Sequence, residues 1–413
     1  MTAGTRVAVI GGGAAGMMAA GYLQSLGASV VLYERNRKTG AKLLITGKGR
    51  CNVTNACDIP TFIHNVMHNP RFLYTALSRF SPEDTMAFFE SMGVPLKVER
   101  GNRVFPVSDS AADIVMALRH YLDENGVKTV YHRVKAIEKK GDSFLVLTEE
   151  RSVPFDAVII ATGGKSYQKT GSTGDGYRFA EAFGHTVTPL RPSLVPLECE
   201  EPFCRALQGL SLRNVGVKAF DENGKTVYDD FGELMFTHFG ITGPTVLSMS
   251  AHLADIGKKK YTVSIDLKPA LDEATLDKRL LSDFTKYKNR NFDNALDDLL
   301  PKKLIEPFVR LSGISPFKKV NEITKEERHR IALLLKGLTV TVKRTRPLEE
   351  AIVTAGGVSV KEIDPKTMES RLCPGLFFAG EVIDVDAYTG GFNLQIAFAT
   401  ARLAAEGVLG ISW

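Results

Sequence analysis

Residues 5–16 read TRVAVIGGGAAG, and this stretch decides the fold of the N-terminal part of the chain. Thr5 to Ile10 is a short run rich in β-branched residues, which is typical of a buried strand. The glycines end this run, and residues 14–26 have a helical composition. Residues 28–33, ASVVLY, give a second strand pattern. The order strand, helix, strand predicts a parallel β-α-β unit, and therefore an α/β domain with a doubly wound sheet.

The glycines of this stretch are spaced as G-x-G-x-x-G, directly after a strand and at the start of a helix. This context predicts dinucleotide binding: Gly11 permits a tight turn, Gly13 lets the backbone approach a pyrophosphate, and Gly16 lets helix and strand pack closely. The free N–H groups of the helix N-terminus would hold the anion. Glu34 ends the second strand, 18 residues after Gly16, where a carboxylate accepts from ribose hydroxyls. The alternative is a glycine-rich turn that only packs tightly.

Three later segments bear on which dinucleotide is bound. Residues 156–164, DAVIIATGG, are a strand that ends in a small-residue turn, as found beside the FAD pyrophosphate in flavoproteins. Residues 374–384, PGLFFAGEVID, give another strand, and residues 389–395, TGGFNLQ, give a glycine turn that opens a helix. That helix would direct its positive end toward the flavin edge that becomes negative on reduction. Each segment alone is equally consistent with an ordinary strand-to-helix turn, but together they favour FAD.

Residues 47–55, GKGRCNVTN, form a polar loop interleaved with glycine. Asn52 is expected to hydrogen-bond the flavin edge. Cys51 has no C-x-x-C partner, so we expect a buried structural thiol rather than a dithiol relay. The cations that would neutralise a pyrophosphate near this loop are Lys42, Lys48 and Arg50.

The chain has 413 residues and a mass of 45.2 kDa, which fits two or three domains. Its texture changes at Arg191, where three prolines fall within twelve residues. Residues 129–134 and 144–147 are expected to form a β-meander around the turn at 139–142. The domains that we expect are an FAD-binding domain in two parts (1–190 and 351–413), an inserted β-rich domain (191–270 and 338–350) and a helical insertion (271–337).

Composition limits the remaining function classes. The net charge of +5 comes without a clustered basic run, so nucleic acid is not an expected partner. Five cysteines without a C-x-x-C pair indicate a reduced, cytoplasmic chain. No apolar stretch is long enough to predict a transmembrane helix. No His, Cys or Asp cluster has the spacing of metal ligands, and no metal site is expected.

The chain resembles the BaiN-like family of bacterial flavoproteins from end to end. The most specific element is residues 42–55, KLLITGKGRCNVTN, which is similar to the family signature G-x-G-R-C-N-x-T-N. Residues 236–244, 354–358 and 380–394 resemble further blocks of the family. Ala387 and Phe392 stand where the family pattern has Gly and Tyr. The resemblance implies a discontinuous FAD domain of the glutathione-reductase type, an inserted β-rich domain and a small helical cap.

The candidate site residues follow from these motifs and from the resemblance. Tyr388 and His238 are the candidate proton donors, or they serve only to close the pocket or to pack. The candidate cofactor-binding residues are Gly11, Gly13, Ala14, Ala15, Gly16, Glu34, Arg35, Lys42, Gly49, Arg50, Cys51, Asn52, Val134, Thr162, Gly163, Gly380, Glu381, Gly391, Asn393 and Leu394.

The function that we expect is an FAD-dependent reductase that takes hydride from NADH or NADPH. The resemblance implies as substrate an apolar small molecule with a C=C conjugated to a carbonyl, such as a 3-oxo-4-ene or 4,6-diene of steroid or bile-acid type. We expect it in an apolar cleft between the FAD domain and the inserted domain. A second G-x-G-x-x-G unit is absent, so the nicotinamide would dock transiently. Alternatives are an amine oxidase that uses O₂ and a flavin-bearing accessory protein without turnover. The oligomeric state stays open.

Overall fold

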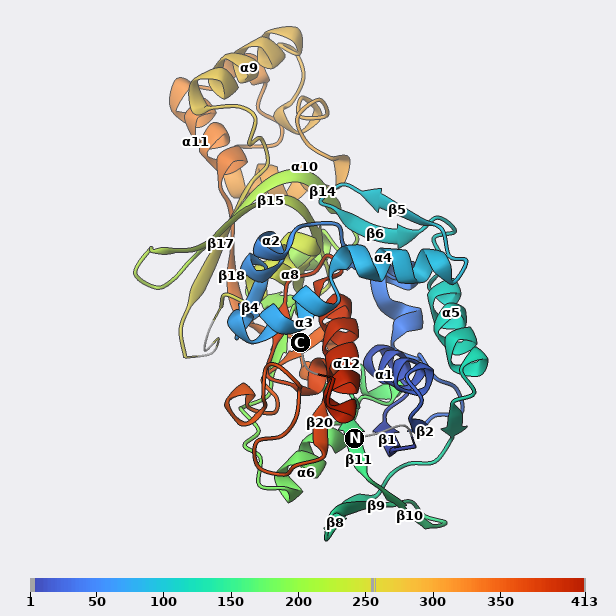
Figure 1. The fold of residues 1–413 in the computed structure, drawn as a ribbon. Coiled ribbons are helices and arrows are strands. Elements are labelled where there is room, and N and C mark those ends of the chain that lie inside the picture. The colour runs from blue at the N-terminus through green and yellow to red at the C-terminus, as the bar shows by residue number, and fades with distance from the viewer. Residues whose placement is uncertain (1–3, 254–255, 257, 412–413) are drawn as a thin grey trace. The chain divides into compact units, whose positions relative to one another are not determined.

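The computed structural model describes residues 4–253, 256 and 258–411 and divides the chain into two units. Unit 1 contains residues 1–193 and 348–413, and unit 2 contains residues 194–347. These divisions fall three residues from the boundaries expected at 190/191 and 350/351. The first unit is therefore discontinuous in sequence, and the chain enters and leaves the second unit once (Figure 1).

The centre of unit 1 is a parallel sheet in the order β20-β11-β1-β2-β7. Strands β1 and β11 are buried along nearly their whole length, as expected for a parallel sheet that is covered on both faces. The strands are β1 (Arg6–Ile10), β2 (Ser29–Tyr33), β7 (Lys128–Val130), β11 (Ala157–Ile160) and β20 (Leu376–Phe378).

Helices pack together beside this sheet, and α1 and α12 make the most extensive contact between helices (Figure 1). Small residues make this close approach feasible, because α1 and α12 are both rich in alanine. The helices of unit 1 are α1 (Ala14–Ser25), α2 (Ile59–His64), α3 (Tyr74–Arg79), α4 (Pro82–Ser91), α5 (Ala111–Glu124), α6 (Asp175–Ala182) and α12 (Phe392–Leu409).

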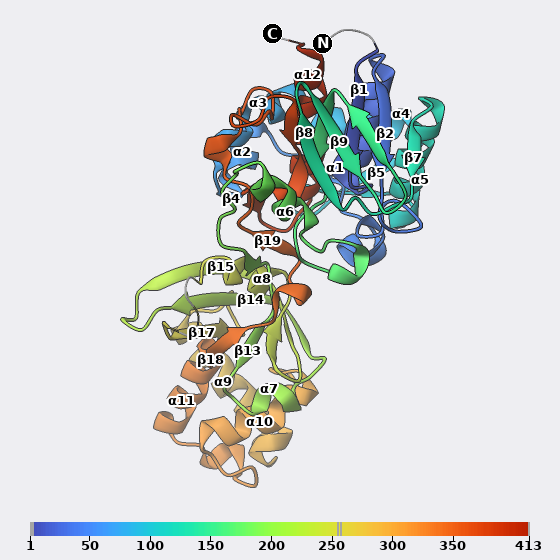
Figure 2. The same cartoon turned by 90° about the horizontal axis from the view of Figure 1, so that it is seen from below.

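A three-stranded antiparallel sheet, β10-β9-β8, contacts strands β1 and β11 of the central sheet (Figure 2). It consists of β8 (Ala136–Lys140), β9 (Ser143–Leu147) and β10 (Ser152–Phe155). The prediction that residues 129–134 belong to this meander is wrong. Residues 128–130 instead form β7, which pairs in parallel with β2 in the central sheet. The register runs from Val31 opposite Lys128 to Tyr33 opposite Val130.

Short strands complete unit 1 and bring distant segments together. β4 pairs with β21, which lies more than 300 residues later in the sequence. β12 pairs with β19, which lies more than 150 residues later. The strands are β3 (Thr54–Asn55), β4 (Val66–His68), β5 (Leu96–Glu99), β6 (Arg103–Pro106), β12 (Arg191–Ser193), β19 (Val353–Ala355) and β21 (Asp386–Ala387).

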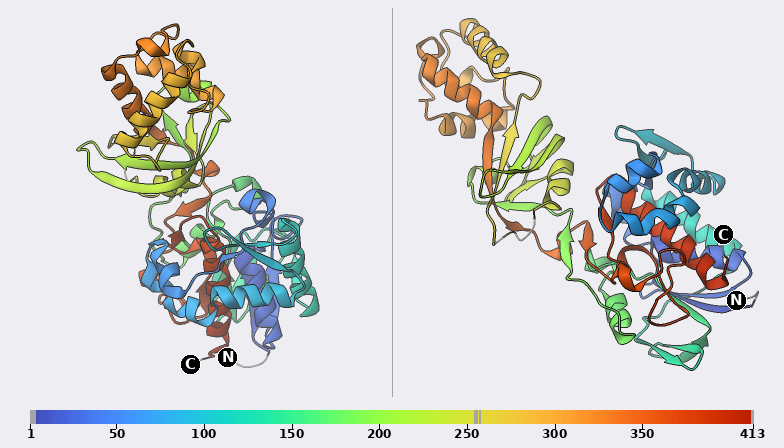
Figure 3. Two further views of the ribbon diagram at one scale, coloured as in Figure 1. Left: turned by 90° about the horizontal axis from the view of Figure 1, so that it is seen from above. Right: turned by 60° about the vertical axis from the view of Figure 1, so that its left-hand side comes forward.

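Unit 2 is a closed barrel with three longer helices at one end (Figure 3). The strand order is β13 (Leu197–Cys199), β16 (Gly240–Thr242), β15 (Thr226–Phe236), β14 (Ser211–Phe220), β17 (Tyr261–Asp266) and β18 (Leu338–Thr345). The helices are α7 (Phe203–Ala206), α8 (Pro244–Ser250), α9 (Glu273–Lys286), α10 (Lys302–Ser312) and α11 (Lys325–Lys336). Leu304, Ile305 and Phe308 are buried, as their helical spacing predicts. Within the described ranges, no helix combines the length and apolar character needed to cross a membrane.

Candidate functional site

The glycine turn between β1 and α1 has the geometry of a dinucleotide cradle. A Cβ on Gly11 would lie 2.5 Å from the carbonyl oxygen of Ala161, and a Cβ on Gly16 would lie 1.7 Å from that of Gly11. Side chains are therefore excluded at both positions. A Cβ on Gly13 would meet no atom of the described residues within 4 Å. Gly13 is the N-cap of α1 and no side chain caps this helix, so backbone N–H groups face an open approach.

Glu34 follows β2 and lies beside this turn. Its Oε2 accepts a hydrogen bond of 2.8 Å from the N–H of Gly12, and its Oε1 accepts one of 2.7 Å from the N–H of Asn36. Burial raises the pKa of the Glu34 carboxyl, and the two backbone donors oppose this shift. Each oxygen keeps a second lone pair, which leaves capacity for the ribose hydroxyls that the sequence predicts.

The segment after β11 lies against the same turn, because the would-be Cβ of Gly11 also meets Thr162. The Thr162 hydroxyl is buried and has no hydrogen-bond partner among the described residues. Gly163 has a φ of +73°, which favours glycine. Arg35 pairs with Asp175 at the start of α6 at 3.4 Å, and Val134 is buried beyond β7.

Lys42 and Glu381 meet across a long sequence separation. The Nζ of Lys42 lies 2.6 Å from Oε2 of Glu381 and donates a 2.8 Å hydrogen bond to the Ser166 hydroxyl. The other oxygen of Glu381 accepts from the backbone N–H of Thr354 at 2.9 Å. Lys42 was predicted to neutralise a pyrophosphate, but its charge is compensated here by a carboxylate. We therefore assign this pair to holding the loop that precedes GKGRCNVTN onto the end of β20.

Lys42→Met is expected to lower the free energy of unfolding of the apoprotein by about 2 kcal/mol, because it leaves a largely buried carboxylate with neutral partners only. The double variant Lys42→Met/Glu381→Gln should recover part of that loss. Urea unfolding measures both, with Lys135→Met as the control, since the Glu149 partner of Lys135 is 73% exposed. If the double variant lost as much free energy of unfolding as Lys42→Met and Glu381→Gln lose in sum, the coupling between the two side chains would be refuted.

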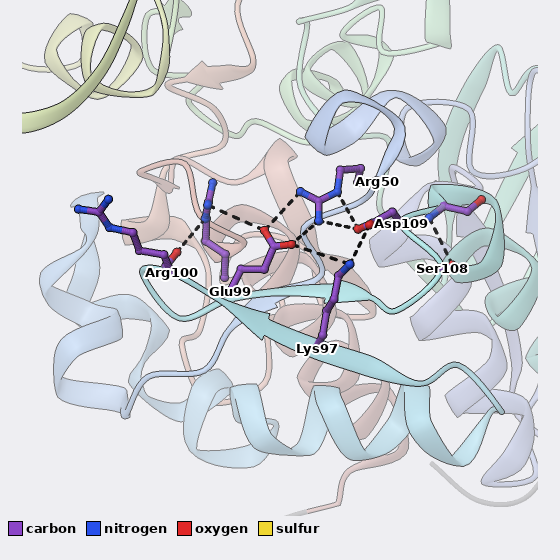
Figure 4. A network of polar contacts seen from close by, with 8 residues as sticks. Arg50, Lys97, Glu99, Arg100, Ser108 and Asp109 are labelled. Atoms are coloured by element: carbon purple, nitrogen blue, oxygen red, sulfur yellow. Dashed lines mark hydrogen bonds and ion pairs between the residues drawn. The ribbon is translucent and has the colours of Figure 1, made fainter. Parts of the chain in front are cut away.

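Arg50 is the centre of an ion-pair network (Figure 4). Its guanidinium donates to Glu99 and, from Nε at 2.8 Å, to Asp109, and it lies 4.1 Å from the centroid of the Phe105 ring. Lys97 donates to Asp109 at 2.7 Å in the same network. The two carboxylates raise the pKa of Arg50. The predicted role of Arg50 in neutralising a pyrophosphate is not supported by this arrangement, since its charge is already paired twice.

Cys51 is fully buried, in agreement with the predicted structural thiol. Burial raises the pKa of the Cys51 thiol to about 11. Its φ of +58° places it in the left-handed region, within the turn that begins at Gly47 (φ +56°). The neighbouring Gly49 has a φ of +85° and is exposed.

Cys51 is expected to resist alkylation in the native protein, because little thiolate forms near neutral pH and the sulfur is shielded from solvent. Iodoacetamide labelling at pH 8 followed by peptide mass spectrometry measures this. Labelling in urea provides the control for the detectability of the peptide. Fast labelling of native Cys51 would contradict the assignment.

Asn52 follows Cys51, and its Oδ1 is buried without a hydrogen-bond partner among the described residues. An unpaired buried acceptor costs free energy, and such atoms occur where a ligand completes the set. Asn52 and Thr162 both belong to the predicted cofactor-binding set. The unused Oδ1 of Asn52 fits a polar ligand at its loop, whereas the Thr162 hydroxyl packs against α6, 2.1 Å from where a Cβ on Gly176 would lie.

The N-terminus of α12 is also uncapped by any side chain, and its first turn contains no acidic residue. A Cβ on Gly391 would lie 2.2 Å from the carbonyl oxygen of Thr54, so α12 begins directly against the loop that follows Asn52. Asn393 donates to the carbonyl of Ala387 at 2.7 Å and holds the preceding turn, and Leu394 is half-buried. Gly380 (φ +77°) follows β20 and lies near Ala15, while Ala14 begins α1.

The two predicted proton donors lie in different units. Tyr388 is half-buried in the turn before α12, and its N–H donates to the carbonyl of Asn65 at 3.1 Å. His238 is exposed on the turn between β15 and β16, with its ring 5.0 Å from that of Phe239. Their roles stay predictions.

A histidine–carboxylate pair close to Tyr388 was missed by the sequence reasoning. His68 Nδ1 hydrogen-bonds Oδ1 of Asp386, which is fully buried. The residues lie 318 positions apart, and the pairing of β4 with β21 brings them together. No local pattern could have found this pair, although Asp386 lies two residues before Tyr388.

The residues of unit 1 fit FAD. A phosphate-bearing dinucleotide would find here the open approach at Gly13, the Glu34 carboxylate, the unused Oδ1 of Asn52 and two uncapped helix N-termini. The family described as the HI0933-like protein Rossmann domain matches residues 5–407. The chain belongs to this family. The resemblance to BaiN-like flavoproteins is thereby confirmed, and by its family the chain is a flavin-dependent oxidoreductase.

Two relatives are similar to this chain over nearly its full length. It is 34% identical over 406 residues to a 3-dehydro-bile acid delta(4,6)-reductase from Clostridium scindens, covering 97% of this chain and 98% of the relative. It is 33% identical over 402 residues to a ribosomal RNA dihydrouridine synthase from Escherichia coli, covering 97% of each.

A solved structure is similar in fold. The crystal structure of 3-ketosteroid delta1-dehydrogenase from Sterolibacterium denitrificans has a TM-score of 0.53, with 13% identity and 100% of both chains covered. At this identity the likeness concerns the fold alone, and it agrees with the Rossmann-type sheet and the additional β-rich unit.

Proposed function

We propose that this protein is an FAD-dependent reductase of a C=C bond conjugated to a carbonyl, with NADH or NADPH as the electron donor. The observation that carries the proposal is a bond type shared by two relatives with different substrates. A 4,6-diene beside a 3-oxo group is conjugated to that carbonyl. The C5=C6 bond of uracil, which is saturated in dihydrouridine, is likewise conjugated to the C4 carbonyl. Both are electron-poor at the β-carbon and accept hydride there.

FAD, when bound, supplies the two-electron hydride chemistry. The chain supplies binding and electrostatics. The backbone N–H groups at Gly13 and the start of α1 would hold the pyrophosphate, and Glu34 would hold the ribose. The N-terminus of α12, which has no acid in its first turn, would favour negative charge that develops near it.

We propose a steroid-type or bile-acid-type enone as the first substrate class, supported by the Clostridium scindens relative. Uracil in ribosomal RNA is the second candidate, supported by the Escherichia coli relative at nearly the same identity. The expectation that nucleic acid is not a partner rested on the absence of a clustered basic run, and this second candidate replaces it. The two substrate classes would undergo the same reduction of a conjugated C=C bond. They differ in the rest of the molecule that the protein must bind.

The test is steady-state oxidation of NADH and NADPH by the FAD-loaded protein, with product identified by mass spectrometry. A 3-oxo-4,6-diene steroid and unmodified ribosomal RNA are offered separately. We expect nicotinamide oxidation and a product heavier by two hydrogens with one of them. Peroxide formation from amines without nicotinamide would instead support the oxidase alternative. No turnover with either substrate would overturn the proposal.

A further inference from the structure

His68, Asp386 and Ser193 form a hydrogen-bonded chain in unit 1. Nδ1 of His68 bonds Oδ1 of Asp386, and the Ser193 hydroxyl donates to Oδ2 of Asp386 at 2.8 Å. Asp386 is fully buried, whereas the His68 side chain is 38% exposed. Both oxygens of the buried carboxylate are thus used, one to fix the imidazole and one to be fixed itself. This is the arrangement that orients a histidine for proton transfer.

The second ring nitrogen of His68, Nε2, is not used in this chain of hydrogen bonds. No hydrogen bond joins Nε2 of His68 to another residue in the part of the chain that the structure describes. The ring is held through Nδ1, and 38% of the side chain is exposed. Nε2 is therefore the ring nitrogen left to exchange a proton with a bound molecule or with water.

The hydrogen-bonded chain of His68, Asp386 and Ser193 is linked to the N-terminus of α12. Asp386 pairs with His68 in the β21–β4 ladder, and the next residue, Ala387, exchanges two hydrogen bonds with Asn393, at 3.0 and 2.7 Å. Asn393 is in the first turn of α12, at the uncapped N-terminus. The histidine is therefore tied, through one strand residue, to the helix end that is predicted to face the flavin.

We propose that His68 is the proton donor of this enzyme, with Asp386 and Ser193 as positioning residues. The inference rests on the proposed function. Reduced FAD, when bound, would supply hydride to the β-carbon of the substrate, which would become an enolate. The Nε2–H bond of the imidazolium then breaks, a C–H bond forms at the α-carbon, and neutral imidazole regains a proton from water through its exposed side. We place His68 in this role instead of Tyr388 or His238, because its ring is oriented by a buried partner.

The charges around the imidazole suit an acid near neutral pH. The hydrogen bond to Asp386 raises the pKa of His68, opposed by partial burial and by Arg191. Asp384 adds a further raising effect. The protonated, active form therefore persists to higher pH than in a free histidine, and activity should fall as the pH rises through the raised pKa. Asp386→Asn removes the main cause, so the fall should move to lower pH.

The test compares His68→Gln, Asp386→Asn and the wild type, all loaded with FAD. Reduction of the flavin by nicotinamide needs no proton at the α-carbon and should be unchanged in both variants. Reduction of the C=C substrate should slow about 100-fold in His68→Gln. The matched control is His120→Gln, since His120 also pairs with a carboxylate, Glu124 at 2.9 Å, but is 63% exposed on α5. His120→Gln should behave as the wild type.

A readout independent of turnover is the imidazole NMR titration of the full chain without substrate. The His68 resonance, assigned by its loss in His68→Gln, should titrate above pH 6.5 and move lower in Asp386→Asn. Equal C=C reduction by wild type and His68→Gln, with the titration as expected, would overturn the inference and leave a structural link. Absence of any turnover in the wild type would instead overturn the proposed function. The two failures are thus distinguished.

Discussion

Gly13→Val is expected to abolish FAD retention while the apoprotein keeps its stability. The backbone at Gly13 has φ −85° and ψ −163°, which a valine adopts without strain, and its Cβ would meet no described atom within 4 Å. The branched side chain would instead occupy the approach to the N–H groups at the start of α1. We expect FAD affinity to fall by at least about 100-fold, a loss of roughly 3 kcal/mol of binding free energy.

Gly16→Ala is the matched variant with the opposite pattern. Its Cβ would lie 1.7 Å from the carbonyl oxygen of Gly11, so α1 cannot keep its packing on β1. We expect the apoprotein to lose most of its stability. Flavin absorbance after gel filtration and thermal unfolding of the apoprotein measure the two effects. A Gly13→Val protein that retains its FAD would refute the location of the cradle.

Asn52→Leu is expected to change apoprotein stability and FAD affinity in opposite directions. The buried Oδ1 of Asn52 has no partner among the described residues, so replacing the amide by an apolar group of similar size removes an unpaired acceptor. The free energy of unfolding of the apoprotein should rise by about 1 kcal/mol. FAD affinity should fall about tenfold, because a hydrogen bond to the cofactor is lost.

Thr85→Val is the control for the two opposite effects expected of Asn52→Leu, higher apoprotein stability and lower FAD affinity. The Thr85 hydroxyl on α4 is likewise buried without a partner in the described ranges, but Thr85 is outside the predicted cofactor set. It should gain stability in the apoprotein with FAD affinity unchanged. Denaturant unfolding and fluorescence titration with FAD give both quantities. If Asn52→Leu bound FAD as well as the wild type, the amide would have no role in the cofactor site.

Local patterns were sufficient where the physical cause is local. The strand, glycine turn and helix at residues 5–26 were predictable because Gly11 and Gly16 are required by contacts within that segment or with a neighbouring strand end. The place of Glu34 directly after β2 was predictable from its spacing, since the length of α1 fixes where β2 ends. The burial of Leu304 and Phe308 followed from helical periodicity.

Charged side chains were less predictable, because their partners lie far away in the sequence. Lys42 and Arg50 were assigned to a pyrophosphate from their place in a glycine-rich loop. Their carboxylate partners, Glu381 for Lys42 and Glu99 with Asp109 for Arg50, come from other elements. The His68–Asp386 pair was not predicted for the same reason, because the two residues are 318 positions apart. Residues 129–134 were misassigned because pairing with β2 depends on a parallel register that a strand pattern does not encode.

The most direct test of the central claim is an anaerobic stopped-flow spectrum of the FAD-loaded protein. The oxidised-flavin band is followed on mixing with NADH or NADPH, and the reduced protein is then mixed with a 3-oxo-4,6-diene steroid or unmodified ribosomal RNA. We predict bleaching by a nicotinamide and recovery of the band with one of the two conjugated substrates. A flavin that is not reduced by either nicotinamide, or that is reoxidised by neither substrate, would contradict the account.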